Sequence, residues 1–168
     1  EDIWDEDAGH FQARHDEQPI PAVTPYNLYP LWTGQLPEPI RQRLIAHLTH
    51  PEEFWGRYAI PSVARNHPDH DPNTMWRGPV WVNINYFFVE ALRQIGDEAL
   101  ADELRDKTLD LILSQPGIYE YYHPETGEPP PTAAEAFGWT AAIFIDLAIE
   151  ASREEDLGGR APSFAEAE

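Results

Sequence analysis

Apolar residues recur at helical spacing in four stretches of the chain, and this pattern predicts four helices. In the first stretch, about 38–50, Ile40, Leu44 and Leu48 lie four residues apart and so share one face of a helix. Pro51 follows, and a proline restricts the residue before it to extended backbone. The first predicted helix is therefore amphipathic and ends just before that proline.

The other three predicted helices differ in how apolar they are. The stretches at about 79–95 and 135–153 are apolar on almost all sides, which is typical of inner helices that other elements cover. The stretch at about 98–113 carries leucines on one face and acidic residues on the other, as an outer helix does. Gly78 and Pro79 suit the start of the 79–95 helix, because glycine can cap a helix and a first-turn proline loses no hydrogen bond.

Long loops separate these helices. Residues 19–37, 51–75 and 114–134 lack a helical pattern, and the first of these loops holds five prolines among aromatic side chains. A short ribbon near 118–122 is the one strand run that the pattern indicates. Residues 3–11, with Gly9 before Phe11, suggest a helix end that passes into a short extended piece. Compact helix bundles have short connections, so inner and outer helices joined by long loops predict an all-α fold that is a partial α/α toroid.

The length of 168 residues fits a single domain. We predict that this domain covers residues 1–153. Residues 154–168 are acidic and rich in glycine, alanine and proline, and we predict that they are a disordered tail, because such a segment buries too little apolar surface to fold.

The composition excludes several classes of function. Eleven basic residues against 30 acidic ones give a net charge of −19, which disfavours binding to nucleic acids and to anionic membranes. The chain has no cysteine, so disulfides, thiolate nucleophiles and cysteine-bound metals are excluded. No stretch approaches the roughly 20 apolar residues of a membrane-spanning helix. The acidic N-terminal residues lack the plan of a signal peptide and read like the middle of a longer protein, and we expect a cytoplasmic location.

A metal site is one interpretation of the loop that contains His67 and His70. The two histidines lie three residues apart, with Asp69 and Asp71 beside them. No third ligand follows at a fixed spacing, which favours a solvated loop. The sequence also has no glycine-rich phosphate loop and no Gly-x-Ser-x-Gly elbow. We therefore expect neither a metal nor a cofactor.

One stretch, residues 76–86, concentrates side chains that suit a sugar. Indole faces stack on the C–H groups of sugars, while Arg77 and Asn85 offer hydrogen-bond donors to the hydroxyls. On the predicted helix, Trp81 and Asn85 lie four residues apart and share a face. The alternative is that the tryptophans belong to the core and Arg77 to a structural salt bridge. The polar neighbours favour a ligand site, because burying them without partners is costly.

Glu120 is the candidate proton acceptor of a second stretch, residues 119–128. It stands between Tyr119 and the pair Tyr121–Tyr122. Aromatic neighbours take water away from a carboxylate and so make it a stronger base, able to accept a proton from an attacking water. The alternative is a surface glutamate in a loop, which is the commoner role of such a residue.

Five runs of residues, in this order, resemble the C-terminal part of the mannosylglycerate hydrolase-like glycoside hydrolases. These enzymes belong with the glucosidase I family and are similar to trehalases in fold. The most specific runs are Trp-Arg-Gly-Pro-x-Trp and the Glu-Tyr-Tyr run that leads to Phe-Gly-Trp-Thr-Ala-Ala. The likeness covers about residues 1–150, and the five runs lie at 4–11, 29–32, 54–62, 76–86 and 120–128.

The resemblance implies an (α/α)6 barrel and inverting hydrolysis of an α-glycosidic bond. Two carboxylates then flank that bond, roughly 6.5–9.5 Å apart, which leaves room for a water. Matched residue by residue, Glu120 falls at the family's general base. The walls of the family's sugar pocket fall at Trp76, Arg77 and Trp81, and we add Gly78, Asn85, Trp32 and Trp139 as further substrate-binding candidates.

The chain departs from this family in what it lacks. The family's general acid is an aspartate upstream of anything present here, and a full barrel has more helices than the four predicted. Pro129–Pro131 also stand where relatives tend to be glycine-rich.

We therefore expect a fragment of an inverting glycoside hydrolase that carries the general base but not the general acid. The expected substrate is an α-linked glucoside or mannoside, such as mannosylglycerate, glucosylglycerate or an oligosaccharide. We expect an enzyme only when the missing N-terminal part supplies the acid. The alternative is a non-catalytic helical remnant that binds a carbohydrate or another protein.

Overall fold

The structure, a computed structural model, describes residues 3–158, with side chains to residue 153. The α-helices of this part are α1 (Glu38–Leu48), α2 (Val82–Gln94), α3 (Glu98–Leu113) and α4 (Gly138–Gly158). A 3-10 helix, η1 (Pro25–Thr33), precedes α1. Four two-residue strands lie near the N-terminus: β1 (Trp4–Asp5), β2 (His10–Phe11), β3 (Arg14–His15) and β4 (Gln18–Pro19).

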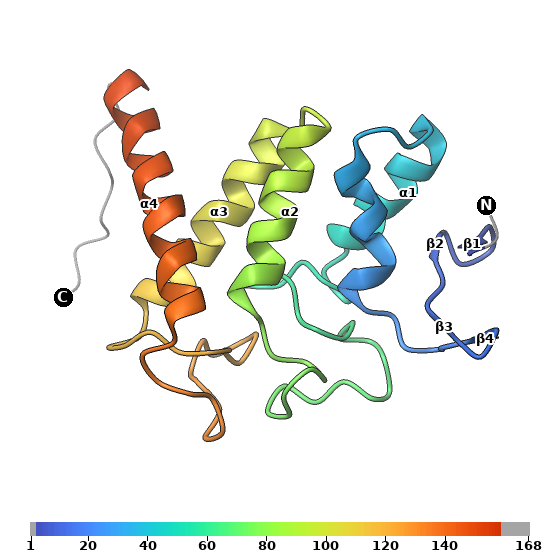
Figure 1. Ribbon diagram of the computed structural model, residues 1–168, viewed down its shortest axis with the longest axis horizontal. Helices are drawn as coiled ribbons and strands as arrows, with labels where there is room; N and C mark the ends of the chain where they lie inside the picture. The colour runs from blue at the N-terminus through green and yellow to red at the C-terminus, as the bar shows by residue number, and fades with distance from the viewer. Residues whose placement is uncertain (1–2, 159–168) are drawn as a thin grey trace.

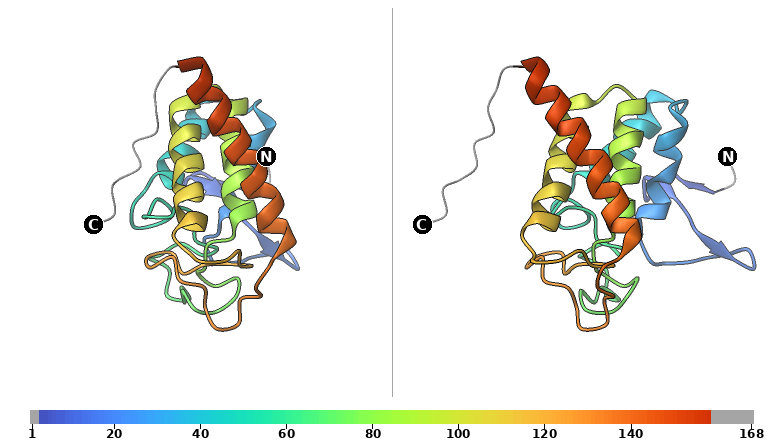
Figure 2. Two further views of the ribbon diagram at one scale, coloured as in Figure 1. Left: turned by 90° about the vertical axis from the view of Figure 1, so that its left-hand side faces the viewer. Right: turned by 60° about the vertical axis from the view of Figure 1, so that its left-hand side comes forward.

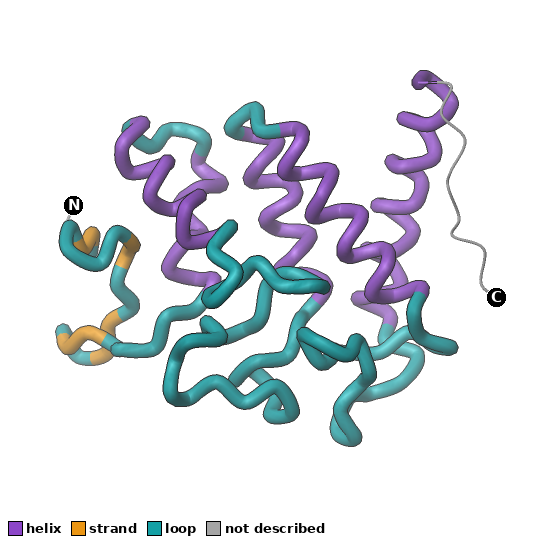
Figure 3. Tube along the Cα trace, turned by 180° about the vertical axis from the view of Figure 1, so that it is seen from behind, coloured by secondary structure: helices purple, strands orange, loops and turns teal. Residues whose placement is uncertain are grey.

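The helices form two layers (Figure 1). η1, α2 and α4 stand side by side in one layer, and α1 and α3 lie behind them, as the view from behind shows (Figure 3). In the side view α3 stands to the left of α2 and α4, which is the rear side of Figure 1 (Figure 2, left). η1, α2 and α4 all begin at the lower end of Figure 1, where the long loops gather. This alternation of inner and outer helices agrees with the predicted partial toroid.

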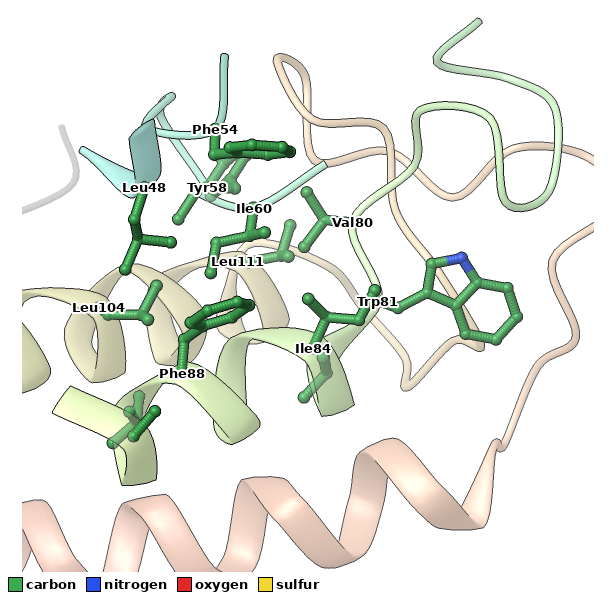
Figure 4. Close-up of a cluster of buried hydrophobic side chains, with 14 of the residues drawn as sticks. Leu48, Phe54, Tyr58, Ile60, Val80, Trp81, Ile84, Phe88, Leu104 and Leu111 are labelled. Atoms are coloured by element: carbon green, nitrogen blue, oxygen red, sulfur yellow. The ribbon is translucent and has the colours of Figure 1, made fainter. Parts of the chain in front are cut away.

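The core lies between η1, α2 and α3. Leu28 of η1, Phe88 of α2 and Leu104 of α3 are all fully buried (Figure 4 shows the last two). Each such side chain contributes roughly 1.5–3 kcal/mol by leaving water. Tyr29 of η1 extends this contact, because its ring stacks on Phe87 with the ring centroids 3.9 Å apart. The helix with apolar residues on nearly all sides, α2, is thus the one that other elements cover, as predicted.

The predicted start of this helix at Pro79 was wrong. α2 begins at Val82, and Trp81 before it is extended, with φ −106° and ψ 121°. Val80 cannot join the helix, because it exchanges backbone hydrogen bonds with Tyr122: the Val80 amide donates at 2.8 Å and the Tyr122 amide at 3.0 Å. Tertiary pairing therefore overrides the local helix signal at this point.

The other helix limits follow the prediction more closely. α3 has the predicted limits, and α1 ends at Leu48, just before the predicted end. α4 begins at Gly138 rather than 135, since Ala136 has a φ of 53°, which does not fit a right-handed helix. It continues to Gly158, and the rest of the predicted disordered tail, residues 159–168, lies outside the described residues. Among the described helices, none is long and apolar enough to cross a membrane.

The N-terminal strands form two short hairpins, whereas the sequence pattern suggested a helix end followed by one short extended piece. β1 pairs with β2 and β3 with β4, all antiparallel. The rings of Trp4 and Phe11 meet edge to face across the first hairpin, 5.1 Å apart. Arg43 of α1 lies over Trp4 and binds Glu6 at 2.9 Å, which fastens this hairpin to the outer layer. Two-residue strands are too short to show the alternation that marks a strand in a sequence.

Candidate functional site

Three loop segments meet at the end of the molecule where α2 and α4 begin. Val80 lies between Pro61 and Tyr122 and forms an isolated antiparallel bridge with each. The Ser62 amide also donates to the carbonyl of Pro79 at 3.1 Å. These bridges bring the two stretches singled out in the sequence, residues 76–86 and 119–128, side by side. The backbone of both stretches is therefore fixed by the same small ribbon.

Aromatic rings join the two stretches on this ribbon. Trp76 and Trp81 stack face to face, with centroids 3.7 Å apart and planes 5° from parallel. Tyr121 follows on, with its ring centroid 5.0 Å from that of Trp81. Trp81 is 2% exposed and Trp76 is 41% exposed, so Trp76 covers Trp81 and presents the indole that solvent reaches. Trp81 stands at the edge of the core cluster, with its indole turned away from Phe88 (Figure 4).

This aromatic pair carries two features that are uncommon in a plain core. Trp76 has a φ of 61°, a left-handed conformation that costs a bulky residue about 1–3 kcal/mol and clusters at functional sites. The indole Nε1 of Trp81 is buried and has no hydrogen-bond partner among the described residues. A buried donor without a partner is costly, and a plain core seldom contains one.

Glu120 is half-buried and is held at both its backbone and its side chain. Its amide donates to the carbonyl of Ala134 at 2.9 Å. The Ala134 amide donates in turn to Oε2 of Glu120 at 3.4 Å. Its neighbour Tyr122 is fully buried, and burial raises the pKa of the Tyr122 hydroxyl above its usual range. The predicted proton acceptor thus lies between the partly buried Tyr119 and the buried pair Tyr121–Tyr122.

Arg77 and Gly78 shape the loop that carries Trp76. Arg77 binds Asp69, through Nε to the carbonyl at 3.2 Å and through Nη2 to the carboxylate at 3.3 Å. Its side chain is nevertheless about half exposed, so it can also reach a ligand. Gly78 does not cap a helix as predicted. A Cβ at this position would lie 2.7 Å from the backbone of Asp71, so only glycine allows the two sides of the loop to approach this closely.

The turn opposite Gly78 is built by one carboxylate. Asp71 accepts hydrogen bonds from the hydroxyl of Thr74 at 2.6 Å and from the amide of Asn73 at 3.0 Å. The Thr74 hydroxyl contributes most to lowering the pKa of Asp71 below its usual value, and the Asn73 amide comes next. These bonds favour the ionised form and keep the turn closed behind Trp76.

The prediction that Asn85 lines a sugar site was wrong. Asn85 is fully buried, because α2 starts later than predicted and its first turn faces the core. Its Nδ2 donates to the carbonyl of Tyr58 at 3.1 Å and to the hydroxyl of Thr108 at 3.0 Å. Its Oδ1 accepts from the amide of Ile60 at 3.3 Å. Asn85 therefore ties the loop before the ribbon to α2 and α3, and it does not share a face with Trp81.

The other two predicted tryptophans lie apart from the stacked pair. Trp139, at the start of α4, is half exposed, and its ring centroid lies 6.2 Å from that of Phe137. Trp32 packs edge to face on Phe87 of α2. Just after it, Gly34 lies against Gln94 at the far end of α2. The structure therefore does not bring Trp32 together with Trp76 and Trp81, and its role as a substrate contact stays a prediction.

The histidine loop makes local hydrogen bonds. Nδ1 of His70 lies 3.0 Å from the carbonyl of Val63, and Nδ1 of His67 accepts from the amide of Asp69 at 3.1 Å. Within residues 3–153, no cluster of three or more histidine, aspartate or glutamate side chains is placed to hold a metal ion.

Two residues that shape the site carry no signal in the sequence. Ala134 bonds to Glu120, and Ala136 adopts a positive φ in the same segment. Alanine carries no functional group, and a positive φ shows in a sequence only when glycine or asparagine adopts it. Tyr121 was visible as a neighbour of Glu120, but its contact with Trp81 depends on the ribbon.

Together, the alternation of inner and outer helices and the long loops gathered at one end are the arrangement of an (α/α)6 toroid. The sequence profile of the family described as mannosylglycerate hydrolase MGH1-like glycoside hydrolase domain matches residues 1–140. The mannosylglycerate hydrolase of Thermus thermophilus is 36% identical over 150 residues, which cover 86% of this chain and 34% of that protein. The chain belongs to the mannosylglycerate hydrolase-like glycoside hydrolases.

Solved structures agree with this assignment. A GH63 mannosylglycerate hydrolase from Thermus thermophilus, in complex with glucose, superposes with a TM-score of 0.76 at 32% identity, over 86% of this chain and 34% of that one. The neutral trehalase Nth1 of Saccharomyces cerevisiae shares the fold, with a TM-score of 0.70 at 19% identity over 95% of this chain and 30% of that one. The described part is thus a partial (α/α)6 toroid, and the chain spans about a third of the length of the mannosylglycerate hydrolases it matches.

Proposed function

We propose that this chain is the C-terminal part of an inverting glycoside hydrolase that acts on an α-linked mannoside or glucoside, of the mannosylglycerate or glucosylglycerate type. Glu120 is the general base. It takes a proton from a water, whose oxygen bonds to the anomeric carbon as the bond to the leaving oxygen breaks. That oxygen takes its proton from a general acid, an aspartate in the upstream part.

The observation that carries this proposal is the ribbon that joins Val80 to Tyr122. It pairs the stretch that carries Glu120 with the stretch that carries the stacked indoles, although most of α2 and the whole of α3 lie between the two in the sequence. Trp76 offers its exposed face to the C–H groups of a sugar, supported by Trp81 below it. The half-exposed guanidinium of Arg77 then donates to hydroxyls.

The inner layer also supports a missing upstream part. Ile145 and Ile149 lie one turn apart on the free side of α4 and are about half exposed. Solvent contact of this kind is unfavourable for an apolar helix face. The relatives indicate what would cover this side of α4, because they are about three times as long as this chain. We propose that the upstream helices of the same toroid cover this side of α4 and bring the general acid to Glu120.

The test is Glu120→Gln in a polypeptide that carries this chain together with the upstream part. Glutamine keeps the size of the side chain but does not accept the proton of the attacking water. We expect kcat on mannosylglycerate or glucosylglycerate to fall about 10²- to 10⁴-fold with KM little changed. Proton NMR of the sugar at early times should show the β-anomer first, as inversion of an α-linkage requires.

Glu128→Gln is the matched control, since Glu128 is an exposed carboxylate further along the same stretch. It should leave kcat and the stereochemistry unchanged. Normal turnover in Glu120→Gln, or release of the α-anomer first, would contradict the assignment of Glu120. If the assembled protein binds the sugar but never hydrolyses it, the chain is the non-catalytic remnant.

A further inference from the structure

The segment from Pro130 to Phe137 runs antiparallel to residues 118–120 and is hydrogen-bonded to them at two points. The amide of Glu120 donates to Ala134, and the amide of Phe137 donates to Ile118 at 3.2 Å. Tyr119 and Glu135 form the bridge between these two bonds. We call residues 130–137 the strap. The strap thus extends the ribbon, because residues 119–122 pair with Val80 through Tyr122 and with the strap through Tyr119.

The two ends of the strap are out of register by one residue. Residue 120 bonds to 134, so a regular antiparallel pair would bond residue 118 to 136, but the bond comes from Phe137 instead. The extra residue is Ala136, whose φ is 53°. One extra residue in a left-handed conformation is a β-bulge, a feature that bends one strand and re-aims its neighbours next to active sites. Here it turns the chain from the strap into α4.

The strap also holds side chains. The hydroxyl of Tyr121 lies 2.7 Å from that of Thr132, and the amide of Ala134 donates to Oε2 of Glu120 at 3.4 Å. Among the described residues no hydrogen bond reaches the other oxygen, Oε1. Pro130 and Pro131 fix their own φ angles, and the carbonyl of Pro130 accepts from Ala133 at 2.8 Å, which stiffens the approach to Ala134.

We infer that the strap positions the general base through the backbone amide of Ala134. The inference rests on the proposed function, in which Glu120 takes a proton from water. The amide holds Oε2 and fixes the plane of the carboxylate, so that Oε1 is directed to the water. Ala134 is a positioning residue, and its amide is the one group of the strap that acts directly on the carboxylate. Its side chain is exposed and takes no part.

Ala134→Pro tests this inference, in the polypeptide that carries this chain and the upstream part. Proline deletes the N–H that binds Oε2 but keeps the carbonyl that accepts from the amide of Glu120, so the pairing of the strap survives. A carboxylate that loses its fixed orientation should lower kcat about 10- to 100-fold, while KM stays within about twofold. Ala134→Ser, which keeps the N–H at this exposed position, is the control and should keep the wild-type kcat.

Because proline can disturb folding, a second variant replaces Ala134 by lactate, which puts an ester oxygen where the N–H stands and leaves φ free. Loss of kcat in both the proline and the lactate variants, with unchanged KM and thermal midpoint, supports the inference. Wild-type kcat in the lactate variant overturns it, and so does an equal loss in Ala134→Ser. Glu120→Gln measured alongside separates the two proposals: if that variant is active the general base is wrong, and if it is inactive while the lactate variant is unimpaired only the strap's role fails.

Discussion

α2 and α4 look alike in the sequence, and the structure gives them different surroundings. Both were predicted as inner helices because apolar residues cover nearly all their sides. α2 has η1, α3 and α4 around it, and even its polar residue Asn85 is fully buried. α4 packs through Ile143 and Leu147 on one side, while Ile145 and Ile149 on the other are 58% and 46% exposed.

The comparison shows that an apolar sequence pattern predicts that a helix will be buried, but not which element will bury it. For α2 the cover comes from this chain. For α4 much of the attachment is polar: Tyr86 bonds to Asp146 at 2.8 Å, and Arg93 pairs with Glu150. The exposed side of α4 then agrees with a chain that spans about a third of the length of its relatives.

Asn85→Ala tests the buried surroundings of α2 and should have the largest effect on the stability of the chain. It leaves the amide of Ile60 and the carbonyl of Tyr58 buried without their partner. Each such group costs about 1–3 kcal/mol, so the free energy of unfolding should fall by about 2–5 kcal/mol in a denaturant titration. Asn83→Ala, a half-buried position of the same helix, should change it by less than about 0.5 kcal/mol. Equal effects of the two substitutions would show that Asn85 is not the tie between α2 and the loop.

Ile145→Asp tests the exposed side of α4. A carboxylate here stays in water in the isolated chain, so its unfolding free energy should move by less than about 0.5 kcal/mol. Assembly with the separately produced upstream part should weaken by about 100-fold or more, because the carboxylate is then buried without a partner. Titration calorimetry measures this. Leu113→Asp on α3, an even more exposed position, is the control and should leave assembly unchanged; unaltered assembly in Ile145→Asp would place the upstream part elsewhere.

Tyr86→Phe tests the hydrogen bond between α2 and α4 and should have the smallest effect on stability. The bond of Tyr86 to Asp146 is the main cause that raises the pKa of Tyr86 to about 12. The neutral hydroxyl is the bonded form, so the bond's contribution to stability is complete below the usual pKa of about 10 and is lost as the pH rises towards 12. Tyr86→Phe should destabilise the chain by less than about 1 kcal/mol at pH 9, and this difference should vanish near pH 12. A difference that persists at pH 12 would mean that packing, not the hydroxyl, carries it.

Local signals predicted some elements well, and contacts between distant segments decided the others. The limits of α3 were predicted, because Gly96, Asp97 and the leucine spacing are local signals. The start of α2 was not, because Val80 is drawn out of the helix by Tyr122, which lies beyond α3 in the chain. The same error moved Asn85 from the predicted sugar site into the core. The stretches that carry Trp76 and Glu120 are paired through Val80 and Tyr122. The strap that holds Glu120 depends on alanine residues that carry no chemical signal.

By itself the sequence determined the helical class, the alternation of inner and outer helices, the family and the stretches that meet at the loop end. Periodic apolar residues and specific motifs encode these features over short distances. The tertiary structure alone decided which indole covers the other, which polar residue is buried, and how the strap passes beside Glu120. Those outcomes depend on backbone hydrogen bonds between distant segments, and a backbone bond forms with almost any residue type, so it leaves no mark in the sequence.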